Sequence, residues 1–232
     1  MKSRKKILVL GIVILLVLLA IPVGIKTFSK KENNDITEKE VQQNKTYTTI
    51  EELLENVEDD HLYTISSEYS FAFEPTPETL YEESDVVLIG TFNKNLKTYS
   101  EKERIKTSTL FNVSEVLKNN SEKTTLSTNV TIERTGGLMD LQQFISENQN
   151  TLREDEFKDV AVNQRKNYYI LQEFGPNNLL DFNNSSDEYI LFLTYVDGKL
   201  MPMCEYYGIR KVENNKIYNY DTKAYEQSEV LE

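Results

Sequence analysis

Apolar residues in this chain recur mostly in short runs and in alternation with polar ones, the two patterns that are typical of β-strands. The run EYILFLTY (188–195) is apolar on both faces, which predicts a strand at the centre of a sheet. It is followed by Asp197-Gly198, the residue pair of a tight hairpin turn. Further strands are predicted in YTISSEYSFAF (63–73), SDVVLIGTF (84–92), KTSTLFNVSEVLK (106–118), NVTIER (129–134), YYILQEF (168–174), YYGIRKV (206–212) and KIYNY (216–220). The pattern therefore predicts a mainly β (α+β) domain.

Three segments interrupt this pattern with helical features. Thr49 stands three residues before Glu52, the spacing of a capping box, and apolar residues follow at helical spacing to Val57. A second helix start is predicted at Thr76-Pro77, because proline is favoured in the first turn of a helix.

Residues 138–157 are the least β-like part of the domain. Leu138, Leu141 and Ile145 lie at helical spacing there, so we expect a helical insertion. The apolar stripe has two interpretations: it packs on the β domain, or it presents an edge that binds a partner protein or peptide.

The N-terminus is a separate unit. Residues 7–25 carry no charge and are long enough to cross a membrane as a helix, which predicts a single transmembrane anchor. Basic residues before the segment favour a cytoplasmic N-terminus and an extracytoplasmic domain. A cleaved signal peptide is the alternative, although its apolar region is usually shorter. The expected organisation is a cytoplasmic tip with the anchor (1–31), a polar stalk (32–48), the extracytoplasmic β domain (49–225) and a loose tail (226–232).

The predicted exported part is strongly acidic. All 38 acidic residues follow position 31, whereas seven of the 26 basic residues lie within residues 1–31, so the remainder carries a formal charge of −19. Proteins bind nucleic acid by placing Lys and Arg on phosphates. We therefore expect no nucleic-acid partner, and consider a cationic partner or ion instead.

The sequence contains no motif for a nucleophile, a cofactor or a complete metal site. His61 is the only histidine and Cys204 the only cysteine, so a solvated His and a small apolar core Cys are expected. Gly90 is followed by Thr-Phe-Asn-Lys-Asn, which lacks the pattern of a phosphate loop, and we expect it to relieve a crowded or bulged strand position.

Two polar features and one aromatic feature leave alternatives open. Asp181, Asn183, Ser185 and Asp187 follow the spacing of a calcium loop, but Ser186 and Phe192 replace its glycine and its bidentate glutamate, so a polar turn with at most weak calcium binding is expected. The pairs Glu82-Glu83 and Asp187-Glu188 are candidates for carboxylate catalysis of glycoside cleavage, but in so acidic a chain some pairs reach the required distance by chance, and this is the favoured interpretation. The tyrosines of the C-terminal half suggest either core packing or a stacking platform: Tyr206, Tyr207, Tyr218 and Tyr220.

The chain resembles a group of uncharacterised, membrane-anchored or secreted proteins of Gram-positive bacteria. The resemblance rests on the order SDVVLIGTF, FNVSEVLK, NVTIERTGG, EYILFLTY and YYGIRKV, and it covers residues 80–220. The layout of that group is similar to the OB-like barrel of tissue inhibitors of metalloproteinases and netrin modules. It implies an OB-like β-barrel here. The N-terminal cysteine that holds metal in those inhibitors is missing, so metalloproteinase inhibition is not expected.

These observations predict a membrane-anchored extracytoplasmic binding or assembly module without a cofactor. Its candidate partner-binding residues are Leu138, Leu141 and Ile145, and its expected partner is a surface protein or peptide. A cell-wall-directed hydrolase that uses paired carboxylates is the alternative.

Overall fold

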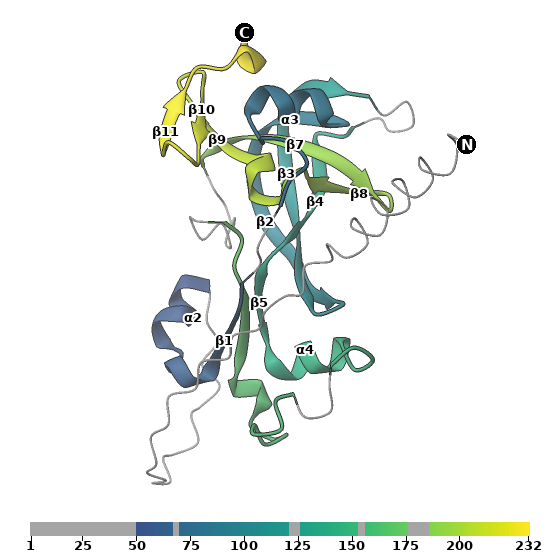
Figure 1. Ribbon diagram of the computed structural model, residues 1–232, viewed down its shortest axis with the longest axis vertical. Helices are drawn as coiled ribbons and strands as arrows, with labels where there is room; N and C mark the ends of the chain where they lie inside the picture. Colours follow the sequence, from purple (N-terminus) through teal and green to yellow (C-terminus); the bar gives the residue numbers. More distant parts are fainter. Residues whose placement is uncertain (1–49, 67–69, 121–125, 153–155, 176–185) are drawn as a thin grey trace, which may run out of the picture.

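The computed structural model describes residues 50–66, 70–120, 126–152, 156–175 and 186–232, and within them the fold is mainly β, as predicted (Figure 1). The strands are β1 (Leu62–Ile65), β2 (Val86–Glu101), β3 (Arg104–Asn119), β4 (Asn129–Thr135), β5 (Gly137–Asp140), β6 (Tyr169–Gln172), β7 (Glu188–Val196), β8 (Lys199–Pro202), β9 (Ile209–Glu213), β10 (Lys216–Asn219) and β11 (Ala224–Glu226). The α-helices are α2 (Ile50–Asn56), α3 (Pro77–Glu83) and α4 (Leu141–Glu147), and the 3-10 helices are η1 (Asp59–His61), η2 (Arg165–Asn167), η3 (Glu205–Gly208) and η4 (Glu229–Leu231).

The longest feature is the antiparallel hairpin of β2 and β3, each of 16 residues. Its tip is formed by Lys102 and Glu103, which both have positive φ angles, 51° and 63°. The register slips at several places along the ribbon, and such bulges increase the twist and bend of a strand pair.

Gly90 lies at one of these register shifts. A Cβ atom added there would lie 1.9 Å from the carbonyl oxygen of Asn112 and 2.9 Å from the ring of Phe111. No side chain fits so close to the partner strand. The expectation that Gly90 relieves a crowded strand position is confirmed.

Five strands of the large sheet form a ring. The order is β2-β3-β4-β8-β7, and β7 pairs again with β2. Neighbouring strands are antiparallel except β4 and β8, which run parallel and pair at Ile132 and Leu200 alone. Strands β9, β10 and β11 extend the sheet outward from β7.

The strand β7 is buried on both faces, which confirms the prediction from its apolar run. Leu191 packs into the main core together with Phe92 and Phe111, whereas Phe192 packs on the other side of the sheet against Leu80 of α3. The aromatic pair Phe92 and Phe111 makes a T-shaped contact with ring centroids 5.0 Å apart.

A second sheet of three strands lies beside the far end of the β2–β3 ribbon (Figure 1). β6 is its central strand, parallel to β1 and antiparallel to β5. It is joined to the ribbon by Gln172, whose Oε1 accepts a hydrogen bond from the backbone N–H of Ile105 at 2.6 Å. α4 covers one face of this sheet through Leu141 and Phe144.

The predicted helices at 49–57 and 76–83 are present as α2 and α3. The predicted helical insertion at 138–157 is only partly helical, since residues Gly137–Asp140 form β5 and the helix α4 has seven residues. The reason is the positive φ of Gly136 (98°) and Gly137 (148°), which turns the chain back so that it pairs with β6. Of the predicted strand at 63–73, the described residues form strand only in β1, and residues 67–69 lie outside the described part of the chain.

The expectation of a loose tail at 226–232 is wrong. The hydroxyl of Ser228 donates a hydrogen bond to the carboxylate of Glu78 at 2.7 Å. Val230 and Leu231 pack on the cluster around Phe192. Burial of these two apolar side chains stabilises the packing of the tail against the sheet.

The predicted anchor at residues 7–25 and the stalk at 32–48 lie outside the described residues. In the part of the chain that the structure describes, no helix has the length and apolar character needed to cross a membrane.

Candidate functional site

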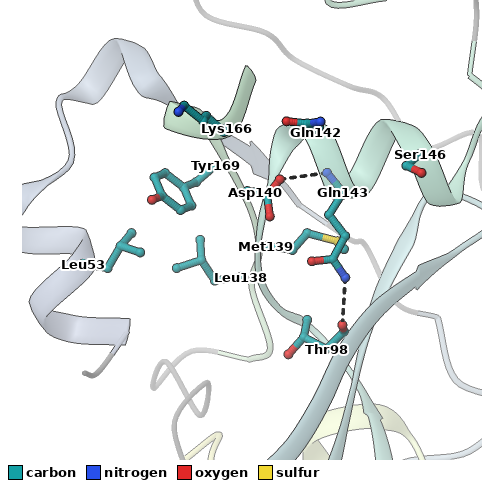
Figure 2. A pocket seen from close by; sticks show the side chains of 10 residues that line it. All are labelled: Leu53, Thr98, Leu138, Met139, Asp140, Gln142, Gln143, Ser146, Lys166 and Tyr169. Atoms are coloured by element: carbon teal, nitrogen blue, oxygen red, sulfur yellow. Dashed lines mark hydrogen bonds between the residues drawn. The ribbon is translucent and has the colours of Figure 1, made fainter. Parts of the chain in front are cut away.

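A groove of about 720 Å³ lies between α2 and α4, over the three-stranded sheet (Figure 2). Leu138 of β5 and Tyr169 of β6 lie near its centre, and Leu53 of α2 forms one side. The other side comes from α4 and the ends from Thr98 of β2 and Lys166 of η2. Its size falls within the range of about 300–1,000 Å³ that is usual for ligand sites.

The α4 side of the groove is held by hydrogen bonds. The carboxylate of Asp140 caps the helix by accepting from the backbone N–H of Gln143 at 2.8 Å. The side-chain amide of Gln143 donates to the carbonyl of Thr98 at 3.4 Å and to the carboxylate of Glu147 at 3.0 Å. The bond from Gln143 to Thr98 joins α4 to β2, and the other two hold the helix and its cap.

The groove combines apolar side chains with hydrogen-bonding groups. Leu53, Leu138 and Tyr169 supply the apolar surface. Gln142 and Ser146 are exposed on α4, and neither side chain has a hydrogen-bond partner among the described residues. Such a surface is suited to contact with a peptide, whose backbone needs both donors and acceptors.

The three predicted partner-binding residues have different positions. Leu138 lines the groove. Leu141 is 0% exposed and packs with Phe144 and Ile105, so its assignment to an exposed apolar edge is wrong. Ile145 is half-buried and packs on the same cluster. The cause is the direction of α4, which turns its apolar stripe toward the sheet.

The groove draws residues from distant parts of the chain, and sequence analysis did not identify most of them. Leu53, Thr98, Lys166 and Tyr169 meet only because β1, β5 and β6 pair beside the β2–β3 ribbon. No local spacing connects them. The signal that could have helped is the capping pattern of Asp140 and Gln143, which marks the start of a helix three residues after two glycines.

Among the described residues, neither His61 nor Cys204 has a catalytic partner. The ring of His61 contacts that of Tyr168 in a tilted arrangement, with centroids 4.2 Å apart, and the carboxylates of Glu58 and Asp60 lie within 4.8 Å of its ligand atoms. This donor group comes from one exposed turn. Cys204 is half-buried against the cluster around Phe192, and burial raises the pKa of its thiol, which fits a packing residue rather than a nucleophile.

The C-terminal tyrosines surround a buried arginine. Arg210 is 1% exposed and donates hydrogen bonds to the carbonyl oxygens of Tyr207, Tyr218 and Pro75. Burial lowers the pKa of its guanidinium. Tyr220 is buried and donates to the carbonyl of Ile209 at 2.6 Å. These contacts support the interpretation that the tyrosines pack in the core, and they do not support an open stacking platform.

The remaining acidic candidates form no cleft in the described residues. Asp181, Asn183 and Ser185 of the possible calcium loop lie outside them, and Asp187 pairs with Lys211 at 2.6 Å. Glu82 and Glu83 are exposed at the end of α3, and neither lines the groove.

No protein-family model matches the chain, and no match was found among curated proteins or solved structures.

Proposed function

We propose that this chain is an extracytoplasmic binding or assembly module, held at the membrane by residues 7–25 and acting without catalysis. The observation that carries the proposal is the groove between α2 and α4. It has the volume of a ligand site, a mixed apolar and amide lining, and no nucleophile beside a base among its described residues.

We further propose that the ring is an OB-like barrel, as the resemblance implies. An OB-fold is a five-stranded, partly open Greek-key barrel. Here β2, β3 and β4 follow one another as antiparallel neighbours, and the hairpin of β7 and β8 joins β2 to β4. β5, β6 and α4 belong to the chain between β4 and β7, whereas α2 and β1 precede β2, so the groove is carried by two additions to the ring.

The occupant we propose for the groove is an extended peptide of a surface protein. Leu53, Leu138 and Tyr169 would cover one or two apolar side chains of such a peptide. The amide of Gln142 and the hydroxyl of Ser146 would bond to its backbone. Lys166 and Asp140 give the lining one charge of each sign, so the groove itself favours neither a basic nor an acidic segment.

The alternative of a wall-directed hydrolase has less support. Two-carboxylate catalysis needs an acid with a raised pKa beside a second carboxylate. Burial raises the pKa of Glu205, but Glu205 does not line the groove. The groove contains one carboxylate, Asp140, which already caps α4.

The test is photo-crosslinking in intact cells. A benzophenone amino acid replaces Gln142, which lines the groove, or Gln149, which is also exposed and lies beyond the end of α4. The proposal predicts a discrete crosslinked product from position 142 and none from position 149. The same products from both positions, or none from either, would contradict the groove as the binding site. Digestion of wall glycan by the purified chain would favour the hydrolase.

A further inference from the structure

The ring contains a second cavity, separate from the groove. β4 and β8 pair at Ile132 and Leu200 alone, and a cavity of about 410 Å³ opens beside this pair, toward Asn129 and Gly198. We call it the seam cavity. It lies between β4 and the β7–β8 turn, in the part of the ring where the described backbone is least connected.

One wall of the seam cavity is continuous with the main core. Val130 and Leu200 line it and are almost fully buried in the core of the ring. Leu126 and Tyr195 also line it and pack on the same core. An apolar group placed against this wall would lose its contact with water, which is the main source of affinity for small ligands.

The rim of the seam cavity carries an ammonium group. The side chain of Lys199 is 50% exposed, and its Nζ lies 2.9 Å from the hydroxyl of Tyr99 and 2.9 Å from Glu133 Oε2. Nζ also lies 3.1 Å from Glu133 Oε1, so the carboxylate binds it through both oxygens. An ammonium has three N–H donors, and the two oxygens of one carboxylate can share one of them in a three-centre bond. The half-exposed ammonium of Lys199 can therefore also donate to an acceptor that enters from solvent.

The carboxylate of Glu133 is less exposed at this rim than the ammonium of Lys199. Glu133 also lines the cavity, but its side chain is 6% exposed, against 50% for Lys199. It lies 3.7 Å from Lys106, which pairs with Glu101 at 2.7 Å, so two lysines balance two carboxylates. An entering group therefore meets the charge of Lys199 before that of Glu133.

A second donor near the cavity lacks an acceptor. The hydroxyl of Tyr195 is buried without a hydrogen-bond partner among the described residues. A buried hydroxyl in this state destabilises the fold by an amount comparable to a lost hydrogen bond. A rotation of the Tyr195 ring toward an entering acceptor would remove that cost.

We infer that the seam cavity binds a small carboxylate with an apolar body. The carboxylate accepts hydrogen bonds from Lys199 Nζ and the Tyr195 hydroxyl, and the apolar body lies on Val130 and Leu200. Two sources have this chemistry: a free organic acid, and the C-terminal residue of a peptide with an apolar side chain.

The test uses titration calorimetry of the full-length chain with four probes. Phenylpropionate and phenylpropanol differ in the carboxylate alone. A short peptide that ends in leucine is compared with a free and with an amidated C-terminus. The inference predicts that phenylpropionate binds more tightly than phenylpropanol. Binding of the free-carboxyl peptide as well would identify chain ends as the source, whereas binding of phenylpropionate alone would identify free acids.

Variants separate the cavity from nonspecific binding. Lys199→Met should weaken phenylpropionate by about tenfold or more, the equivalent of one lost charge-assisted hydrogen bond. Lys211→Met, which removes a lysine paired with Asp187 elsewhere on the sheet, should leave the affinity unchanged. Thr131→Trp places a large side chain at the exposed edge of the cavity and should abolish binding.

The melting temperature of a further variant shows whether a loss of binding is caused by a folding defect. Tyr195→Phe removes the unpartnered hydroxyl, so it should weaken phenylpropionate and yet leave the melting temperature equal or higher. The inference is overturned if no carboxylate probe binds at millimolar concentration. It is also overturned if Lys199→Met and Thr131→Trp bind phenylpropionate as the wild type does.

Discussion

The ammonium of Lys199 on β8 lies 2.9 Å from the carboxylate of Glu133 on β4, and this ion pair spans the one junction of the ring that has a single backbone pair. Tyr99 of β2 donates a hydrogen bond to the same carboxylate. Side chains therefore join three strands where the ladder of backbone hydrogen bonds is shortest. At the junction of β4 and β8, these side-chain contacts join the strands in addition to the single backbone pair.

Replacing Glu133 by Gln should destabilise the protein. The substitution keeps the shape of the side chain but removes the charge that holds Lys199 and Lys106, and hydrogen bonds to charged groups contribute about 1.5–3 kcal/mol. Denaturant unfolding should show a loss of this order. Asp187→Asn is the control, because its pair with Lys211 is exposed and such pairs contribute about 0–1 kcal/mol. Equal losses in the two variants would contradict the role of the cluster.

The same variant has a pH signature. Burial opposes the ionisation of Glu133, but hydrogen bonds from Tyr99 and Lys199 outweigh it and hold the pKa of this carboxyl below its ordinary value. A carboxyl with a lowered pKa in the folded state stabilises the fold above the unfolded pKa, near 4.3, and this contribution disappears as the pH falls through the folded value. The stability difference between the wild type and Glu133→Gln should therefore shrink as the pH falls below about 4. A difference that stays constant down to that pH would show that the charge of Glu133 is not the cause.

Phe192→Ala tests the assignment of β7 as the central strand. Phe192 is 0% exposed and packs between the sheet and α3, so truncation should cost about 3–5 kcal/mol. Val162→Ala is the control, because Val162 is 70% exposed, and its effect should stay within about 0.5 kcal/mol. Thermal melts that ranked the two variants in the opposite order would contradict the placement of β7.

Local sequence patterns predicted the strands well and the groove poorly, for one physical reason. Residues 106–118 alternate between apolar and polar, and residues 188–195 are apolar on both faces. Each pattern reflects the burial of that strand alone, so β3 and β7 could be predicted from the sequence. The groove depends on which strands pair at long range. The parallel pairing of β1 with β6, more than a hundred residues later, brings Leu53 near Leu138, and no periodicity encodes it.

Neighbouring residues on α4 offer a matched test of its two faces. Leu141 is fully buried beneath the helix, whereas Gln142 is exposed in the groove. Leu141→Ser should lower the free energy of unfolding by about 2–5 kcal/mol, because it removes apolar contacts and buries a hydroxyl. Gln142→Ser should leave stability nearly unchanged. Comparable melting temperatures for the two variants would contradict the assignment of Leu141 to the buried face of α4 and of Gln142 to its exposed face.

The predicted anchor is tested by protease protection. Residues 7–25 form an uncharged apolar segment after a basic N-terminus, so the chain should stay in the membrane fraction with its domain outside. Protease added to cells without their wall should digest the domain and spare a tag placed before residue 1. A soluble form that begins near Lys26 would instead identify the segment as a cleaved signal peptide.

The most direct test of the central claim is the affinity of a groove-binding peptide. A peptide is selected from a displayed random library with the full-length chain, and its dissociation constant is measured for the wild type, Gln142→Trp and Gln149→Trp. Both substitutions place an indole at an exposed position, and only the first fills the groove. The account predicts that Gln142→Trp weakens binding by at least about tenfold and that Gln149→Trp leaves it unchanged. Selected peptides that bind all three proteins equally would contradict the groove as the binding site.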